Sequence, residues 1–361
     1  MTSPQLFWDQ GTAYDLFVSL QVLHDPSSFG VRGAWAAGVR ARVPASEREA
    51  LEQVQSMVHV PLHWVYSLPE PRDAATALWA LEQLAPIERL LALYLSLERA
   101  PGGAEAILRE VARRGSWGEA DREALLSTYE DLDPCMEGKA PPSSGKLGEV
   151  LDWWTGAEEL GERYLAAIRA YHEVFFAEEE RRIRPALQAA LERAQELAER
   201  LSLLDLLEEL TQGVRLDAPP AGDILTLAPS YWSTPLVLMG MASKERPVWL
   251  FGARPADASL VPGEVVPETL LRTLKALSDP TRLRILRDLS QESLSPAQIA
   301  RRLRLRAPTV THHLKILRLA GLVQMTLADE KQPRSYAARQ EAVSAACDSL
   351  KSFLGTGGND G

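Results

Sequence analysis

The stretch RAPTVTHHLKILRLAGLV (residues 306–323) contains two adjacent histidines, although the whole chain has only six. Neighbouring imidazoles can bind a metal ion, act as a catalytic base, or contact another molecule through their ring nitrogens. Apolar Val310, Leu314 and Leu317 recur at spacings of four and three, which predicts a helix that buries one stripe. The residues around the histidines therefore decide which chemistry is available.

The face opposite this stripe carries short hydroxyls, an imidazole and an ammonium group: Thr309, Thr311, His312 and Lys315. Such groups contact base edges and phosphates in the major groove of DNA. Arginines surround the helix start, where backbone N–H groups also attract phosphate: Arg301, Arg302, Arg304 and Arg306. We expect this face to read DNA and His313 to lie at the flank, near the packed side.

A metal site at the two histidines would need further ligands, and residues 295–305 contain no Cys, Asp or Glu. His59 and His63 have the i, i+4 spacing of a zinc helix, but Pro61 lies between them, so a turn or core position is the better interpretation. His172 belongs to a charged helical stretch whose simplest interpretation is a solvated face. We therefore expect no metal and no cofactor.

Helix signals divide the rest of the C-terminal region. Asp279 and Pro280 mark one helix start, and Ser295 and Pro296 mark the next, as N-cap and first helical residue. The segment LVQMTLADEKQPRSYAA, which follows the histidine helix, predicts a β-hairpin. Three helices, a reading helix and a hairpin form a winged helix-turn-helix, which we place at residues 268–355.

The segments LKALSDPTRLRILRDL and PAQIARRLRLRAPTVTHHLKILRLAGLV resemble the ArsR family of winged-helix repressors over about 80 residues. The resemblance implies a dimer that binds palindromic operator DNA through Thr309, Thr311, His312 and Lys315. It also implies backbone contacts from the hairpin residues Lys331, Arg334 and Tyr336.

Metal-sensing members of that family carry a Cys pair in the third helix or Asp and His ligands in the last helix. This chain has Gln298, Arg301 and Arg302 in the third helix, and a lone Cys347 without histidine in the last. Metal sensing through those sites is therefore not expected. With some 265 residues ahead of the winged helix, the chain resembles a subgroup with a large N-terminal domain of unassigned role, through its segments PSYW and STPLVL.

Charge is divided unevenly along the chain. From residue 268 onward there are 15 Lys and Arg against 9 Asp and Glu, a net charge of +6, whereas the preceding residues carry −16. A small basic module is thus joined to a large acidic one, which favours nucleic acid as the partner of the basic module. No apolar run is long enough to span a membrane and no signal peptide is recognisable, so we expect a cytoplasmic protein.

The N-terminal part is predicted to be helical up to about residue 212. Short helices broken by Pro and Gly are followed by a linker-like segment at 137–146 and a long helical stretch at 156–209, which Pro185 is expected to kink or divide. Short apolar segments between residues 213 and 253 predict a small antiparallel sheet.

The N-terminal part offers few signs of chemistry. It contains no G-x-S-x-G, G-x-G-x-x-G or P-loop motif. All nine tryptophans precede the winged helix, at positions 8, 35, 64, 79, 117, 153, 154, 232 and 249. Core packing explains each one singly, but together with Tyr231 and Phe251 they could line an apolar ligand pocket.

These patterns predict a mainly α protein in which an N-terminal helical domain is closed by a small antiparallel β-sheet and followed by a C-terminal winged helix-turn-helix. We place the N-terminal domain at 1–253, with its sheet at 213–253, a connector at 254–267, and a disordered tail at 356–361.

We interpret the chain as a homodimeric transcriptional regulator, most simply a repressor, that binds double-stranded operator DNA and is not an enzyme. Its N-terminal domain would sense an apolar small-molecule effector or set the dimer. Two alternatives stay open: an enzyme joined to a DNA-binding module, and a purely architectural dimerisation domain.

Overall fold

The computed structural model describes residues 4–56, 59–94, 103–128, 144–243, 246–255, 258, 266–327 and 334–354. The connector at 254–267 falls partly, and the tail at 356–361 wholly, outside these residues. Among them, no helix is both long and apolar enough to cross a bilayer.

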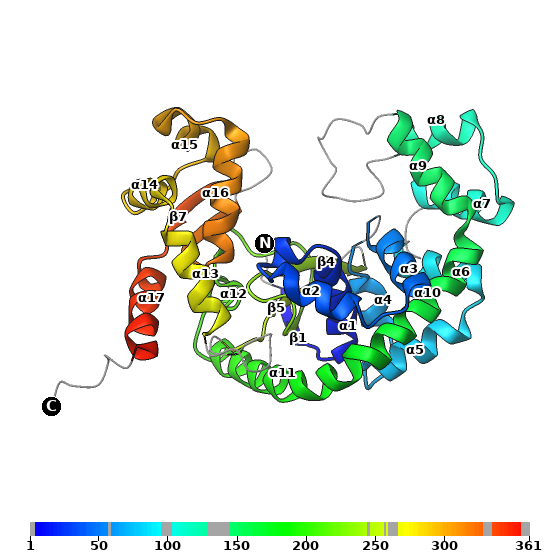
Figure 1. The fold of residues 1–361 in the computed structure, drawn as a ribbon, viewed down its shortest axis with the longest axis horizontal. Helices are drawn as coiled ribbons and strands as arrows, with labels where there is room; N and C mark the ends of the chain where they lie inside the picture. Colours follow the sequence, from blue (N-terminus) through cyan, green and yellow to red (C-terminus); the bar gives the residue numbers. More distant parts are fainter. Residues whose placement is uncertain are drawn as a thin grey trace.

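The N-terminal part is a short strand followed by many helices. In chain order these are β1 (Gln5–Trp8), α1 (Thr12–His24), the 3₁₀-helix η1 (Pro26–Phe29), α2 (Gly33–Arg40), α3 (Ala45–Gln55), α4 (Leu62–Ser67), α5 (Ala74–Gln83), α6 (Pro86–Tyr94), α7 (Ala104–Arg114), α8 (Glu119–Ser127), α9 (Ser144–Thr155), α10 (Ala157–Tyr171), a π-helix (His172–Phe176), α11 (Ala177–Ala198) and α12 (Leu203–Thr211). Figure 1 shows α7 to α9 at one side of the molecule, with α10 and α11 running beneath towards the other side.

Pro185 lies inside α11 and does not divide it. The apolar residues Ile183, Leu187 and Leu191 bury one face of the helix around the proline. Burial of this stripe offsets the loss of the backbone hydrogen bond that a proline cannot donate. The irregular turn lies earlier, in the π-helix at residues 172–176.

Four strands form the N-terminal sheet in the order β1-β3-β5-β4, with β3 at Ile224–Ser230, β4 at Leu238–Ser243 and β5 at Arg246–Gly252. The hairpin β4–β5 is antiparallel, as expected, but β1 pairs with β3 and β3 with β5 in parallel. The expectation of a wholly antiparallel sheet is therefore wrong, because β3 and β5 run parallel and because the expectation did not include β1, which lies over 200 residues away.

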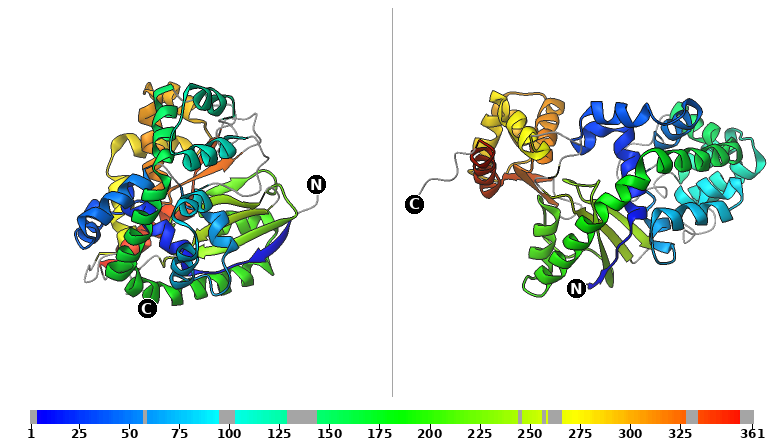
Figure 2. Two further views of the ribbon diagram at one scale, coloured as in Figure 1. Left: turned by 90° about the vertical axis from the view of Figure 1, so that its right-hand side faces the viewer. Right: turned by 60° about the horizontal axis from the view of Figure 1, so that its bottom comes forward.

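The central strands β3 and β5 are buried on both faces, which explains why they are nearly continuously apolar. Leu225, Leu227 and Trp249 pack with Ala194 of α11 and with α12 in one cluster. Residues of the opposite face, such as Leu250, join the larger core that α1 and the other N-terminal helices build. Figure 2 shows the sheet beside the long α11 helix.

The winged-helix elements are α13 (Glu268–Leu277), α14 (Pro280–Leu289), α15 (Pro296–Leu303), α16 (Ala307–Leu319), β6 (Val323–Leu327), β7 (Ser335–Ala338) and α17 (Gln340–Phe353). They enclose a separate core centred on Ile285, Val310 and Leu317. The mainly helical class with a C-terminal winged helix is thus confirmed.

One strand of the wing sheet comes from the N-terminal part. Strand β2 (Val214–Leu216) pairs in parallel with β6, rather than with the N-terminal sheet in which we expected it. Gly213 has a φ of 138° and its Cα lies so close to the Val323 carbonyl that an added Cβ would be 3.2 Å from that oxygen. Glycine therefore allows the chain to turn into the wing sheet at this point.

Candidate nucleic-acid interface

The helix starts of the winged helix are capped as the sequence indicates. The Asp279 carboxylate accepts a hydrogen bond from the Arg282 N–H at 2.9 Å, which begins α14. Ser295 and Gln298 form a reciprocal capping box at the start of α15. Arg304, with a φ of 54°, then turns the chain from α15 into α16. These local bonds fix how α16 projects from the module.

The N-terminal half of α16 is open to solvent. The side chains of Arg306, Thr309, Thr311 and His312 are exposed, while Val310 on the opposite face is fully buried. The Thr311 hydroxyl donates to the Ala307 carbonyl at 3.1 Å, which leaves the lone pairs of its oxygen available to accept hydrogen bonds. The structure therefore presents these predicted DNA-reading residues together on one accessible surface.

His313 differs from its neighbour as expected. It is half-buried, and its Nδ1 atom has no hydrogen-bond partner among the described residues. Burial lowers the pKa of His313, and the nearby Asp279 carboxylate only partly opposes this effect. A neutral imidazole at the packed flank is a structural group rather than a phosphate contact.

The end of the same outward face, at Ile316 and Leu319, lies against the N-terminal domain, which the sequence did not predict. Leu319 lies seven residues after His312, on the same side of the helix, yet it is only 7 % exposed. Together with Ile316 it borders a pocket whose other wall includes Gly30 and Val31, between η1 and α2. In the sequence, the only indication of this contact is that apolar Ile316 and Leu319 lie on the outward face of the helix.

Lys315 is held by that same docking contact. Its ammonium donates to the Ser28 hydroxyl of η1 at 2.9 Å. Partial burial raises the pKa of Asp25, but hydrogen bonds from Ser28 and Ser27 and the charge of Lys315 bring that pKa below its ordinary value. Lys315 is nevertheless exposed, and this contact with η1 limits the positions that its ammonium can take towards a phosphate.

Polar contacts reinforce the docking at α13. The Glu268 carboxylate pairs with the Arg32 guanidinium at 3.0 Å, although only 9 % of its side chain is exposed. Arg272 donates to the Gly30 carbonyl at 3.4 Å. The winged helix is thus joined to residues 28–32 through both α13 and α16.

The wing residues are placed less uniformly. Arg334 is exposed just before β7, whereas Tyr336 is half-buried, packs on the winged-helix core and pairs with Leu294 through its backbone. Lys331 lies outside the described residues. Among the described residues of the wing, Arg334 thus offers an exposed cation to a partner.

The helix-turn-helix domain family matches residues 277–326, which span α14 to β6. A search of curated proteins gave no match. The chain therefore contains a helix-turn-helix domain of the kind that binds DNA.

The tryptophans do not converge on one cavity. Among the described residues, Trp35 and Trp232 lie 4.7 Å apart between ring centroids, tilted by 34°, beside Phe175, while Trp153 and Trp154 pack on each other. Trp79, by contrast, is 56 % exposed. These rings are therefore spread through the core and the surface, and an aromatic ligand pocket stays a prediction.

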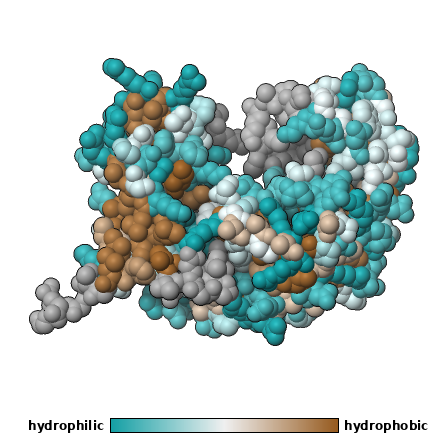
Figure 3. Space-filling view, in the orientation of Figure 1, coloured by the Kyte–Doolittle hydropathy of each residue, from teal (hydrophilic) through white to brown (hydrophobic). Residues whose placement is uncertain are grey.

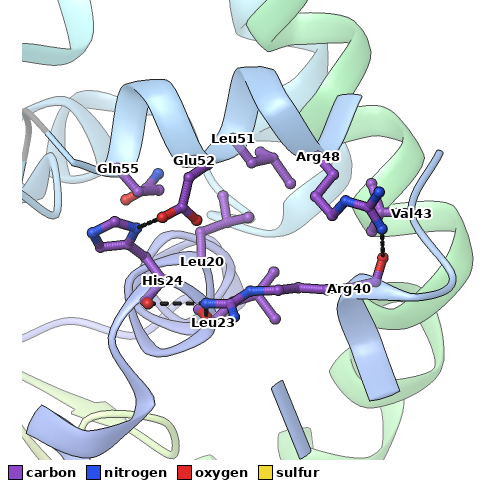
Figure 4. Close-up of a pocket in the computed structure, with 9 residues that line it drawn as sticks. All are labelled: Leu20, Leu23, His24, Arg40, Val43, Arg48, Leu51, Glu52 and Gln55. Atoms are coloured by element: carbon purple, nitrogen blue, oxygen red, sulfur yellow. Dashed lines mark hydrogen bonds and ion pairs between the residues drawn. The ribbon is translucent and has the colours of Figure 1, made fainter. Parts of the chain in front are cut away.

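The N-terminal part contains one histidine–carboxylate ion pair among its described residues, His24 with Glu52 at 3.1 Å (Figure 4). Such a pair resembles a catalytic base, but the adjoining cavity is only about 10 Å³. That volume holds about one water molecule and no substrate. Within the described residues no three His, Cys, Asp or Glu side chains are grouped as metal ligands.

Proposed function

We propose that the chain is a cytoplasmic, homodimeric transcriptional repressor that reads operator DNA with α16 and the wing, and that it regulates rather than catalyses. The observation that carries this proposal is the accessible N-terminal half of α16, with Thr309, Thr311 and His312 beside Arg306. Residues at the start of a recognition helix are those that reach base edges.

The proposal of a dimer rests on α17 and its surroundings. Helix α17 buries none of its residues, and Leu283, Phe353 and Leu354 are among the large apolar side chains left exposed. Figure 3 shows apolar residues gathered over α13 and α17. A second copy of the chain would cover this surface and present two reading helices to a palindrome. The resemblance to dimeric winged-helix repressors supports the same arrangement.

We further propose that the N-terminal domain senses a small molecule. Its contacts with α13 and with the end of α16 give a bound ligand a direct route to the reading helix.

Selection of duplexes from a random library by the full chain tests the function. The proposal predicts an enriched palindrome with half-sites about one helical turn apart. It also predicts that a promoter overlapping this palindrome is transcribed less in vitro when the protein is added. Recovery of no preferred sequence would contradict the proposed reading function, and activation of that promoter would contradict the repressor role.

A further inference from the structure

A cavity of about 400 Å³ lies where the N-terminal domain meets the winged helix. Helices α11 and α12 form one wall, and the end of β5 with Arg254 forms another. Helix α13 and the last residues of α16 close the winged-helix side. Small-molecule sites commonly have this size and occur between domains.

Arg254 brings a buried positive charge to this cavity. The residue is only 8 % exposed, and its Nη2 atom donates to the Thr234 carbonyl at 2.6 Å. The guanidinium lies 5.8 Å from the centre of the Tyr231 ring. Its Nη1 atom is buried and has no hydrogen-bond partner among the described residues. An arginine buried with a free donor is costly unless an acceptor is supplied.

A second arginine, Arg272 of α13, lines the same cavity and its Nε atom also lacks a described hydrogen-bond partner. Burial and the positive charge of Arg272 lower the pKa of Arg254 to about 10. The buried carboxylate of Glu268 favours the charged form of both arginines, but it is paired with Arg32. The cluster therefore contains more positive than negative charge.

The rest of the wall has a different character. Phe251, Leu210 and Leu319 contribute apolar surface, and Glu209, which also borders the cavity, is paired with the exposed Arg193 at 3.3 Å. A ligand that satisfied both regions would carry an anionic group at one end and an apolar body at the other.

We propose that this interdomain cavity binds a small organic anion, a carboxylate or phosphate joined to an apolar body, with its anionic group between Arg254 and Arg272. A guanidinium presents paired donors that match such oxyanions. This proposal rests on the proposed function in one respect, because the anion would be the effector of the proposed regulator.

The position of Arg272 connects this site to the reading helix. Arg272, which lines the cavity, donates from its Nη1 atom to the Gly30 carbonyl, and Ser28, two residues before Gly30, accepts a hydrogen bond from Lys315. An anion that binds the Nε atom of Arg272 shifts the guanidinium whose Nη1 atom donates to Gly30. Occupancy of the cavity therefore acts on the loop that covers part of α16.

Isothermal titration of the full chain without DNA tests the site, so that failure of DNA recognition does not affect the result. Octanoate, octan-1-ol and inorganic phosphate serve as probes. We expect octanoate to bind once per chain. Octan-1-ol has the same apolar body without the charge, and its affinity should be lower by about tenfold or more. Phosphate, which lacks the apolar body, should also bind more weakly than octanoate.

Two variants and one control locate the binding. Arg254→Gln and Arg272→Gln should each weaken octanoate binding by about tenfold or more, because each removes a charged donor. Arg215→Gln, which removes an exposed arginine outside the cavity, should leave binding unchanged. If Arg254→Gln fails to fold, Arg272→Gln decides, because that side chain is less buried. No saturable octanoate binding, equal binding of octan-1-ol, or unaltered affinity in the folded variants would overturn the proposal.

Discussion

Asp15 of α1 is a carboxyl group with no exposed surface, and its ionisation should make stability depend on pH. Its Oδ1 atom accepts hydrogen bonds from the Ser230 hydroxyl and the Trp232 N–H, both at 2.8 Å. Its Oδ2 atom has no described hydrogen-bond partner. Burial raises the pKa of Asp15 to about 7, from an ordinary value of 3.8, although these hydrogen bonds oppose the rise.

The direction of the effect follows from proton binding. Between these two pKa values the folded protein holds a proton on Asp15 that the unfolded chain has released, so acid favours the folded state. The stabilisation is fully present below pH 3.8 and is lost as pH rises through about 7. At about 1.4 kcal/mol per pH unit the whole effect is about 4 kcal/mol, of which about 3 kcal/mol is lost between pH 5 and pH 8.

Urea unfolding of the wild type and of Asp15→Asn at pH 5 and pH 8 measures this loss. All nine tryptophans precede residue 268, so their fluorescence reports on the part of the chain that contains Asp15. Asn cannot ionise, and the stability of Asp15→Asn relative to wild type should rise by about 3 kcal/mol from pH 5 to pH 8. Asp348→Asn, at an exposed carboxylate of α17, is the matched control and should show no such change. A difference between wild type and Asp15→Asn that is independent of pH would refute the reasoning.

Three further outcomes are expected for DNA binding. Ser28→Ala should free Lys315 and strengthen binding to duplex DNA by about two- to fivefold, the size of one net hydrogen bond, and weaker binding in an electrophoretic shift assay would contradict the docking argument. Arg334→Ala should weaken operator and random duplexes equally and reduce the slope of log affinity against log salt by about 0.9, whereas a loss confined to the operator would mean a base contact. Stoichiometric zinc, cobalt or arsenite should leave operator affinity unchanged, and release of DNA by one equivalent would show a metal site that residues 295–305 do not suggest.

The winged helix could be predicted from sequence because its signals are local. Asp279 and Ser295 cap helices within three residues of themselves, and Val310, Leu314 and Leu317 reveal the buried stripe of α16 by their spacing alone. Interactions of this range are encoded in a short segment and do not depend on the rest of the fold.

The N-terminal sheet and the cavity could not be predicted in the same way. Strand β1 has four residues and finds its partner β3 more than 200 residues later, so no short window contains the pairing. Arg254 and Arg272 likewise come together only because α13 docks beside the end of β5. The burial of Leu319 at the end of α16 depends on the same long-range packing, although an apolar residue on the outward face of this helix indicates a contact surface.

The most direct test of the proposed function is the specificity ratio of His312→Ala, the affinity for the selected operator divided by the affinity for a random duplex. His312 is exposed on the accessible half of α16, so its loss should lower this ratio by about 5- to 150-fold, the equivalent of about 1–3 kcal/mol for a base contact. His59→Ala, at an exposed histidine of the N-terminal part, should leave the ratio unchanged. If competition binding gives the same ratio for His312→Ala and the wild type, α16 does not read the operator through this face.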